Sequence, residues 1–531
     1  MWNNDKVIAP SKNVVIECNQ RLSKSLLWRF QRNFFDRQGV EAWNQGTVPH
    51  YITSNPFIAN AYAKVIFGFL RDCHAQGLNT DQPVYIMELG AGSGRFAYHF
   101  LKKFFEFFHR SPLNHISVKY VMTDFTDRNL AFWRSHPFLY PFVRSGVLDF
   151  ARFDMERDRQ LTLDYGSYIL SAATLKNPLI VLANYVFDSI PSDAFSVRNG
   201  QLYESLVTLI PPQPVSDLND PTLINQVEIN FEDYPITSNY YDNPNFNKIL
   251  ENYRQRLQDT TILFPRVGLK CIDNLRYLSG DRLLLISGDK GYSQEQALLN
   301  RGYPSLTRHG HCFSLMVNYN AIRQYFLQIG GQFLNIAHRH NSLNICAFLL
   351  GSPFKGCVET RLAFTEHIEQ LGPDDFFSLK KAIENHYDTL TLPQILAWLR
   401  ASGWDANIFL GSFPTLIQHL NTASESFQQE LYQAIEGIWE TYYPIGEQKD
   451  LAFHLARLLY KMRYYREASL YLQYSLMLYG ANAITLYNLG KCYYRLGQLE
   501  QAIEQLDRAL EVDPSLEAAR SMRIKIGLAE G

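Results

Sequence analysis

The sequence predicts an α/β protein with a seven-stranded sheet, followed by an all-α region that runs to the C-terminus. Between residues 84 and 350, short apolar runs alternate with amphipathic segments, as is typical of a parallel sheet covered by helices. The last two apolar runs are joined only by residues 338–342, which is too short for a parallel crossover and predicts an antiparallel hairpin. The expected strands are Val84–Glu88, Lys119–Thr123, Leu148–Phe153, Leu179–Ala183, Arg282–Ser287, Gln332–Ala337 and Asn344–Leu349.

The chain has 531 residues, too many for one hydrophobic core, and we expect four parts. These are an N-terminal helical extension (1–80) that contributes to the functional site, the sheet domain (81–351), a helical connecting domain (352–445) and helical repeats (446–531). An insertion over about 192–265 separates the fourth and fifth strands and is far longer than a usual loop. We expect this insertion to form substrate-recognition structure, and the alternative is a partly disordered segment.

Composition narrows the class of protein. The net charge of −2 offers no general attraction for nucleic acid, and no apolar run is long enough to span a membrane. The first residues lack the pattern of a secretory signal. Seven scattered cysteines, none spaced C-x-x-C, indicate reduced core thiols. We therefore expect a cytoplasmic protein that binds neither nucleic acid nor membrane, and the 32 tyrosines suit a protein that binds other proteins.

A 34-residue period appears near the C-terminus. One copy consists of Leu489, Gly490, Tyr493, Gly497, Ala502, Leu506, Ala509 and Pro514. A degenerate copy lies one period earlier, at Leu455, Ala456, Leu459, Arg463, Ala468, Leu472, Ser475 and Gly480. This alternation of small and large residues resembles the tetratricopeptide repeat, which implies that the region binds a protein partner. Residues 515–526 are expected to form the capping helix.

A glycine-rich turn follows the first expected strand. Residues 84–95 read VYIMELGAGSGR, an apolar strand followed by an acidic residue and three glycines at alternate positions. Glycine has no Cβ and tolerates positive φ, so such a turn lets the backbone approach a ligand closely. The dinucleotide fingerprint would need a third glycine where Arg95 stands, and no P-loop pattern occurs. The alternative is an ordinary strand-to-helix turn that is rich in glycine and binds no ligand.

The pattern E-x-G-x-G-x-G resembles the first motif of class I S-adenosylmethionine-dependent methyltransferases. That resemblance implies that Glu88, Gly90, Gly92 and Gly94 hold the amino-acid part of the cofactor and the neighbouring ribose. The order of five strands and a closing hairpin agrees with the seven-stranded, Rossmann-like sheet of that class.

Acidic residues follow the next two strands. Asp124 ends the second strand, where a carboxylate can accept hydrogen bonds from both ribose hydroxyls. Asp127 competes with it, but its position suits a cap of the following helix.

Asp154 follows the third strand, where a carboxylate can accept the adenine amino group while Met155 packs on the ring. Asp149 and Glu156 are the alternatives to Asp154.

The fourth strand runs into Asn184 and Asp188, a plausible pair for orienting the substrate beside the methyl donor. Residues 182–191, LANYVFDSIP, resemble the A-N-E-x-x-D-A-x-P signature of the MidA-like methyltransferases. Residues 50–56, HYITSNP, resemble that family's G-D-F-x-T-x-P-E loop and imply a cofactor contact for Thr53. Glu204 matches the family's acidic position after the fourth strand and is a further catalytic candidate.

The family resemblance implies a protein substrate, and arginine for its best-known member. Two departures weaken the transfer, because Tyr185 stands where the family has a glutamate and Phe57 stands where it has another. A guanidinium must be held by carboxylates, so losing two of them matters, although Asp188 and Glu204 can compensate.

Two H-x-H pairs, 309–311 and 338–340, invite a metal interpretation. No acidic ligand adjoins them and methyl transfer from a sulfonium needs no metal, so we expect none. His309 or His311 as a wall of the active site is the better hypothesis, with Asp289 and Tyr292 as comparable candidates.

The leading hypothesis is an S-adenosylmethionine-dependent methyltransferase acting on a protein that the C-terminal repeats recruit. One alternative is a methyltransferase for a small molecule or a peptide natural product. The other is a non-catalytic scaffold or assembly factor that binds the cofactor without turnover.

Overall fold

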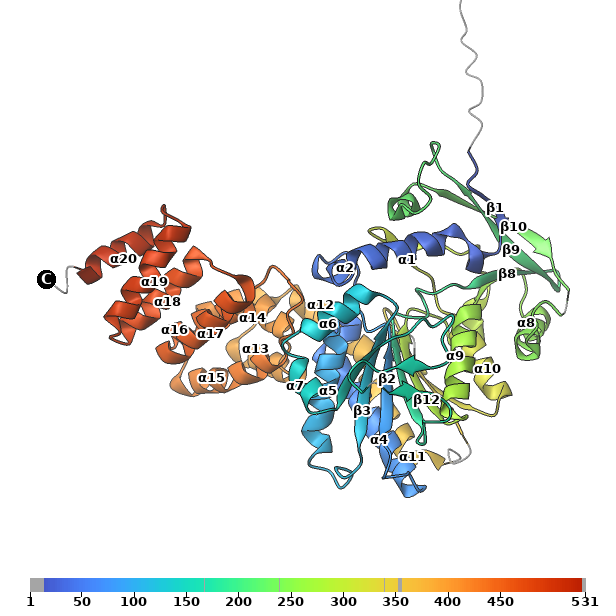
Figure 1. The fold of residues 1–531 in the computed structure, drawn as a ribbon, viewed down its shortest axis with the longest axis horizontal. Coiled ribbons are helices and arrows are strands. Elements are labelled where there is room, and N and C mark those ends of the chain that lie inside the picture. Colours follow the sequence, from blue (N-terminus) through green and yellow to red (C-terminus); the bar gives the residue numbers. More distant parts are fainter. Residues whose placement is uncertain (1–13, 167, 238, 339, 352–355, 528–531) are drawn as a thin grey trace, which may run out of the picture. The chain divides into compact units, whose positions relative to one another are not determined.

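The computed structural model describes residues 14–166, 168–237, 239–338, 340–351 and 356–527. The chain divides into two compact units, Met1–Phe376 and Phe377–Gly531 (Figure 1). Across the residues described, no helix combines the length and the apolar character that a bilayer crossing requires.

The first unit is built on a seven-stranded sheet, as predicted. The strand order is β15-β16-β12-β7-β2-β3-β4. Each strand lies within two residues of its expected bounds, and the observed bounds are β2 (Val84–Leu89), β3 (Val118–Asp124), β4 (Leu148–Arg152), β7 (Leu179–Asn184), β12 (Leu283–Asp289), β15 (Gln332–Asn335) and β16 (Asn344–Leu350).

The expected hairpin closes this sheet. Strands β4, β3, β2, β7 and β12 run parallel to one another, whereas β16 pairs antiparallel with β12 and β15 antiparallel with β16. Because the parallel strands point the same way, their carboxyl ends meet at one edge of the sheet, where open α/β proteins bind ligands.

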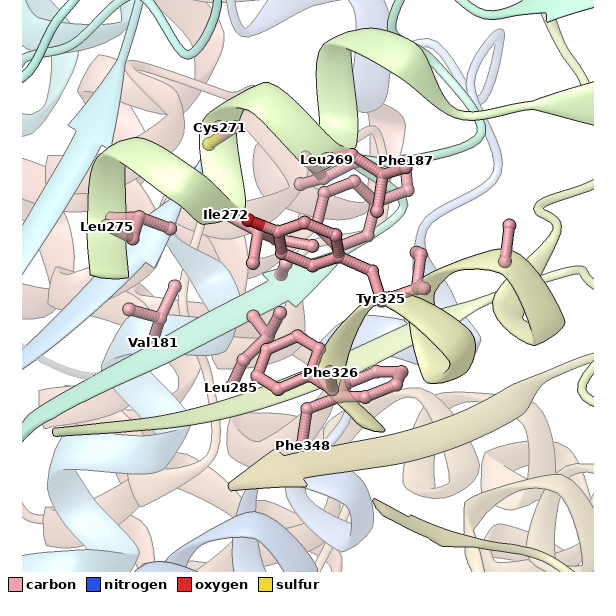
Figure 2. Close-up of a cluster of buried hydrophobic side chains, with 14 of the residues drawn as sticks. Val181, Phe187, Leu269, Cys271, Ile272, Leu275, Leu285, Tyr325, Phe326 and Phe348 are labelled. Carbon is pink, nitrogen blue, oxygen red and sulfur yellow. The ribbon is translucent and has the colours of Figure 1, made fainter. Parts of the chain in front are cut away.

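Helices cover both faces of the sheet. On one face, α9 (Arg266–Ser279) and α10 (Tyr319–Gln328) pack on side chains from β7, β12 and β16 (Figure 2). Alternate strand residues point to this face, which is why every second position of the strands belongs to the same cluster. On the other face, α4 (Pro56–Ala75) packs beside α5 (Arg95–Phe108).

The insertion forms a second sheet of five strands. Its strands β8 (Asp193–Arg198), β9 (Gln201–Ile210), β10 (Glu228–Pro235) and β11 (Thr260–Phe264) pair antiparallel. The fifth strand, β1 (Glu17–Gln20), comes from the N-terminal part, where only helices were expected. Its partner β9 lies far away in the sequence, so no local sequence pattern predicts this pairing. The N-terminal helices are α1 (Leu26–Gln38), α2 (Glu41–Asn44) and α3 (Tyr51–Ser54).

Shorter elements complete the first unit. They are α6 (Asp127–Ser135), α7 (Tyr140–Arg144), β5 (Leu161–Thr162), β6 (Ile169–Leu170), α8 (Pro244–Arg256), β13 (Thr307–His309), β14 (Cys312–Ser314) and α11 (Val358–Phe364).

The second unit is helical. Successive helices pair as α16 (Leu451–Lys461) with α17 (Tyr465–Tyr479) and α18 (Ala483–Arg495) with α19 (Leu499–Val512), and α20 (Glu517–Gly527) packs on the last pair. Gly490 permits the close approach of α18 and α19, because a Cβ there would lie 3.0 Å from Leu506 Cγ. The helices from α12 onward are α12 (Pro373–Glu384, which spans the boundary), α13 (Leu392–Ala401), α14 (Ala406–His419), α15 (Glu425–Glu440), α16 (Leu451–Lys461), α17 (Tyr465–Tyr479), α18 (Ala483–Arg495), α19 (Leu499–Val512) and α20 (Glu517–Gly527).

Candidate active site

A cavity of about 490 Å³ opens at the carboxyl ends of β2, β3, β4 and β7. The structure brings most of the predicted site residues to its wall. Those that line it are Thr53, Glu88, Gly90, Gly92, Asp124, Asp154, Met155, Asn184 and Asp188. The cavity therefore lies where the strand order predicts a ligand site.

The glycine turn after β2 forms one wall. Gly90, Gly92 and Gly94 have φ of +59°, +54° and +80°, the left-handed region that favours glycine. The Trp133 indole N–H donates to the Gly92 carbonyl at 2.9 Å, and a Cβ on Gly92 would lie 2.9 Å from the Trp43 ring. Conformation thus favours glycine at all three positions, and space requires it at Gly92 as well. Gly94 does not line the cavity and serves instead as the left-handed residue before α5.

Asp124 holds this turn from the end of β3. Its Oδ2 accepts from the Gly92 N–H at 3.3 Å and from Asn129 Nδ2 at 2.9 Å, while Oδ1 accepts from the Thr126 N–H at 2.9 Å. Burial raises the pKa of Asp124, and these hydrogen bonds oppose the shift. The carboxylate lies on the cavity wall and fits the predicted role of a ribose acceptor. Its rival Asp127 is largely exposed, in the first turn of α6, 3.5 Å from Arg152.

Glu88 ends β2 at the bottom of the same wall. Its Oε2 accepts from the Tyr120 hydroxyl at 2.8 Å, and it is 5% exposed. Burial, together with the charge of Asp124, raises the pKa of Glu88 to about 8. The carboxyl therefore keeps its proton at neutral pH until a positive group, such as the α-ammonium of the cofactor, approaches it.

Asp154 follows β4, beside Met155. Its Oδ2 forms an ion pair with Arg32 at 3.0 Å, and its Oδ1 accepts from the Glu156 N–H at 3.0 Å. The Arg32 guanidinium also lies 4.6 Å from the centre of the Phe125 ring. An adenine amino group that binds Asp154 would therefore share this carboxylate with the Arg32 guanidinium. Nothing in the amphipathic pattern of α1 marked Arg32 as a site residue.

The end of β7 contributes an unusual backbone. Tyr185 has φ of +54°, an uncommon conformation for a large residue, and its N–H donates to the Gly288 carbonyl at 3.0 Å. Asn184 Oδ1 accepts from the Tyr62 hydroxyl at 2.8 Å, whereas its buried Nδ2 has no partner among the described residues. Local strain with an unpaired amide is typical of a functional site.

A pair of carboxyl groups, Asp188 and Asp289, adjoins this strand end. Asp188 lies on the cavity wall, and Asp289, at the end of β12, is fully buried behind it. Their titrations are coupled, and a protonated Asp289 is placed to donate to Asp188. Burial raises the pKa of Asp188 to about 6. Burial and the charge of Asp188 raise the pKa of Asp289 well above its ordinary value. Of the two carboxyl groups, Asp289 therefore holds its proton more strongly than Asp188 does.

The N-terminal part reaches the cavity through α1 and the loop before α3. The Thr53 hydroxyl donates to the His50 carbonyl at 3.1 Å, and burial with the nearby Arg95 lowers the pKa of His50 to about 3. His50 is thus neutral at ordinary pH. Phe57, the first departure from the family pattern, does not line the cavity, and its ring stacks on Phe376 with centroids 4.3 Å apart.

Glu204 lies outside the cavity lining. It sits on β9 in the second sheet, where its Oε1 accepts from Arg21 Nε at 2.9 Å. Its charge is already balanced by that arginine. The structure therefore does not bring Glu204 to the other site residues, and its catalytic role stays a prediction.

The β13–β14 hairpin supplies another wall of the cavity, of which the sequence pointed only to the histidines. His309 lines the cavity, as do Cys312 and Phe313, which were not predicted. Burial and the nearby Lys290 lower the pKa of His309. His311 does not line it and lies 3.1 Å from Asn225. In the other H-x-H pair, residue 339 lies outside the described residues.

Comparison with known proteins identifies the class of this domain. Residues 69–286 match a family described as putative S-adenosyl-L-methionine-dependent methyltransferases, and residues 483–516 match the tetratricopeptide repeat. No curated protein matches the chain at a significant level. The fold is similar to that of an uncharacterized COG1565 superfamily protein from Burkholderia thailandensis, at 12% identity and a TM-score of 0.39, covering 63% of this chain and 89% of that one. A second COG1565 superfamily member from that organism was crystallised with S-adenosyl-homocysteine. It is 13% identical with a TM-score of 0.38, and the match covers 59% of this chain and 80% of that one.

The chain therefore contains an S-adenosylmethionine-dependent methyltransferase domain of this family and a C-terminal tetratricopeptide repeat. The resemblance to the MidA-like methyltransferases and the predicted cofactor are confirmed. The residues present fit that cofactor, because the backbone at Gly90 and Gly92 lines the cavity and the carboxyl groups of Asp124 and Glu88 lie on the same wall. When bound, the cofactor supplies an electrophilic methyl group on its sulfonium.

We predict that Asp124→Ala weakens binding of S-adenosylhomocysteine by about 10- to 100-fold, the effect of losing a charged acceptor. Isothermal titration calorimetry on the whole chain measures this. Asp127→Ala is the matched control, because it removes an exposed carboxylate three residues away and should leave the affinity unchanged. If Asp124→Ala and the unaltered protein bind S-adenosylhomocysteine with equal affinity, Asp124 is not the acceptor for the ribose hydroxyls.

Glu88 predicts how stability depends on pH in the absence of cofactor. The folded-state pKa, about 8, lies above the ordinary 4.5, so between these values the folded state binds a proton that the unfolded state has lost. The free energy of unfolding therefore falls as pH rises from about 4.5 to about 8, by about 5 kcal/mol for this group. Urea unfolding across that range should show a flatter profile for Glu88→Gln. The exposed Glu106→Gln should retain the profile of the unaltered protein, and an unchanged slope in Glu88→Gln would contradict the raised pKa.

Proposed function

We propose that the protein transfers the methyl group of S-adenosylmethionine to a protein substrate, which the C-terminal helical repeats recruit. The observation that carries the catalytic part is the joint position of the glycine turn and the Asp188–Asp289 pair at one cavity. One side of the cavity suits the methyl donor, and the other offers a proton acceptor for the group that is methylated. The tetratricopeptide match supports a protein as the acceptor.

Each residue has a distinct task in this proposal. Ionised Asp188 accepts a hydrogen bond from the nucleophile of the substrate and takes its proton as the methyl group is transferred. Asp289 holds Asp188 in place by donating a hydrogen bond to it and lowers the cost of its charge in a buried position. Asn184 offers its free Nδ2 as a donor for orienting the substrate or the donor molecule.

A cationic side chain such as that of arginine suits a wall that carries Asp188, because a carboxylate both holds a guanidinium and accepts its proton. Tyr185 stands beside it in place of an acid, so Asp188 carries this task without a second carboxylate from that position. The cytoplasm is the compartment we propose, since most of the cysteines are buried free thiols.

Labelling with S-adenosylmethionine that carries a tritiated methyl group tests the substrate class. The purified full chain is added to a cell extract, and the label is followed in macromolecules and in small extractable compounds. We expect label in protein, which protease removes, and much less of it with the cofactor-site variant Asp124→Ala at the same cofactor concentration. Label confined to small compounds would show a small-molecule methyltransferase, and no transfer in any fraction would show a non-catalytic cofactor-binding scaffold.

The carboxyl pair predicts a pH profile for the methyl transfer. Because Asp188 must be ionised and its pKa is about 6, kcat should fall as the pH drops through about 6. Asp188→Asn should lower kcat about 100-fold and leave the affinity for S-adenosylhomocysteine unchanged. Asp289→Leu removes the donor that lowers the pKa of Asp188, so the midpoint should move to higher pH. The proton-acceptor role would be excluded by a profile that is the same in all three proteins.

A further inference from the structure

The second sheet ends in an open strand that the methyltransferase site does not use. Strand β10 (Glu228–Pro235) pairs with β9 along its whole length, and no further strand among the described residues pairs with it (Figure 1). A strand at the edge of a sheet presents a row of unpaired backbone groups that another chain can use as a template. Proteins usually shorten or cover such an edge, so an open edge of eight residues is a candidate binding surface.

The register of the pairing identifies the backbone groups that face outward. The Ile236 N–H, one residue beyond the strand, donates to the Leu202 carbonyl at 3.2 Å. Because bonded and non-bonded pairs alternate in an antiparallel ladder, the even-numbered residues of β10 bond to β9 and the odd-numbered residues turn their N–H and C=O groups away from it. Ile229, Phe231 and Asp233 therefore offer backbone donors and acceptors outward. No backbone hydrogen bond in the described part of the chain uses these outward groups.

The side chains around this edge carry an excess of negative charge. Residues 199–247 contain seven Asp and Glu and no Lys or Arg, so the charge is local in a chain whose net charge is only −2. Arginines from elsewhere in the chain lie beside two of these acids. Glu228 and Glu232 on β10 are exposed, and neither has an ion-pair partner among the described residues. Four residues apart on a strand, they lie on the same face of the sheet.

The opposite face of β10 is apolar. Ile229 and Phe231 pack against the hydrophobic core between the second sheet and the N-terminal helix. The Phe231 ring stacks on Tyr303 with centroids 5.4 Å apart, and Tyr303 is 44% exposed. Apolar surface therefore remains accessible beside the open edge. A strand added to this edge places every second side chain beside the two glutamates and the others beside this apolar surface.

We propose that β10 binds an extended segment of a partner protein, in which basic side chains alternate with apolar ones, as an added strand of the second sheet. Main-chain hydrogen bonds supply the affinity, and the alternate side chains supply the selectivity. A second copy of this chain is disfavoured, because pairing two β10 strands brings the glutamates of both copies together. The same charge repels nucleic acid. Only the further step, that the docked protein is the methyl acceptor, rests on the proposed function.

Fluorescence anisotropy with the full chain, in the absence of cofactor, tests the docking. The labelled probe is a peptide that alternates lysine with valine. The controls are the same peptide with methylated backbone amides and a peptide that alternates glutamate with valine. We expect the lysine peptide to bind at least about tenfold more tightly than either control, with an affinity that falls as salt is raised.

Two outcomes of this titration would overturn the proposal. Equal binding of the methylated peptide would exclude strand addition, and equal binding of the glutamate peptide would exclude selection by charge. Absence of binding by the lysine peptide at about 100 μM protein would show that the two glutamates only protect the edge from pairing with itself, and would likewise exclude the docking.

Charge variants locate the binding. Glu228→Gln with Glu232→Gln should weaken binding of the lysine peptide at least about fivefold. Asp217→Asn with Asp242→Asn is the matched control, because it removes the same charge from exposed positions of the same segment outside β10 and should leave the affinity unchanged. Loss of affinity in both pairs, or in neither, would overturn the site.

A backbone variant tests the hydrogen bonds of the edge. Ile229→Pro removes one outward N–H and no hydrogen bond to β9, and it should weaken the lysine peptide at least about fivefold more than Ile229→Ala does. Equal affinity in these two variants would contradict the added strand. Circular dichroism and thermal unfolding establish that each variant is folded, and if Ile229→Pro is not, the charge pairs and the methylated peptide decide the test. Because no methyl transfer is measured, failure here is distinct from failure of the proposed function.

Discussion

The site depends on one constraint, the left-handed turn that carries the chain from β2 into α5. Gly90, Gly92 and Gly94 all adopt positive φ, and the space beside Gly92 is filled by Trp43. Hydrogen bonds from Trp133 and to Asp124 tie the middle of the turn to the neighbouring strand and helix. A turn held at so many points needs no rearrangement to present its backbone to a ligand. This favours binding, because little conformational freedom is lost on association.

Buried acids give the cavity its chemistry. Glu88, Asp188 and Asp289 all lie where charge is poorly solvated, and each has a raised pKa for that reason. Their surroundings differ, and so do their protonation states near neutral pH. Glu88 has a pKa of about 8, whereas Asp188 has a pKa of about 6 and loses its proton more readily. Environments that push the pKa values of neighbouring carboxyls apart divide them into proton holders and proton acceptors.

The two departures from the family pattern have different physical meanings. Phe57 packs its ring on Phe376, away from the cavity lining, so this replacement serves packing within the first unit. Tyr185 stays on the cavity wall in a strained backbone conformation and changes the surface that a substrate meets.

The amino-acid sequence by itself determined the seven strands, the closing hairpin, the cofactor turn and the acids at the strand ends. Each is written locally, in apolar runs, loop length and glycine spacing, and parallel strands place their ends together by geometry alone. Tertiary structure alone decided which distant residues join them. Arg32 and β1 reach their places through chain folding across more than a hundred residues, Trp43 meets the turn from about fifty residues away, and Glu204 lies in the second sheet, paired with Arg21. Likewise, the carboxyl pair exists because β7 and β12 are neighbours in the sheet, a contact between residues far apart in sequence that no local pattern encodes.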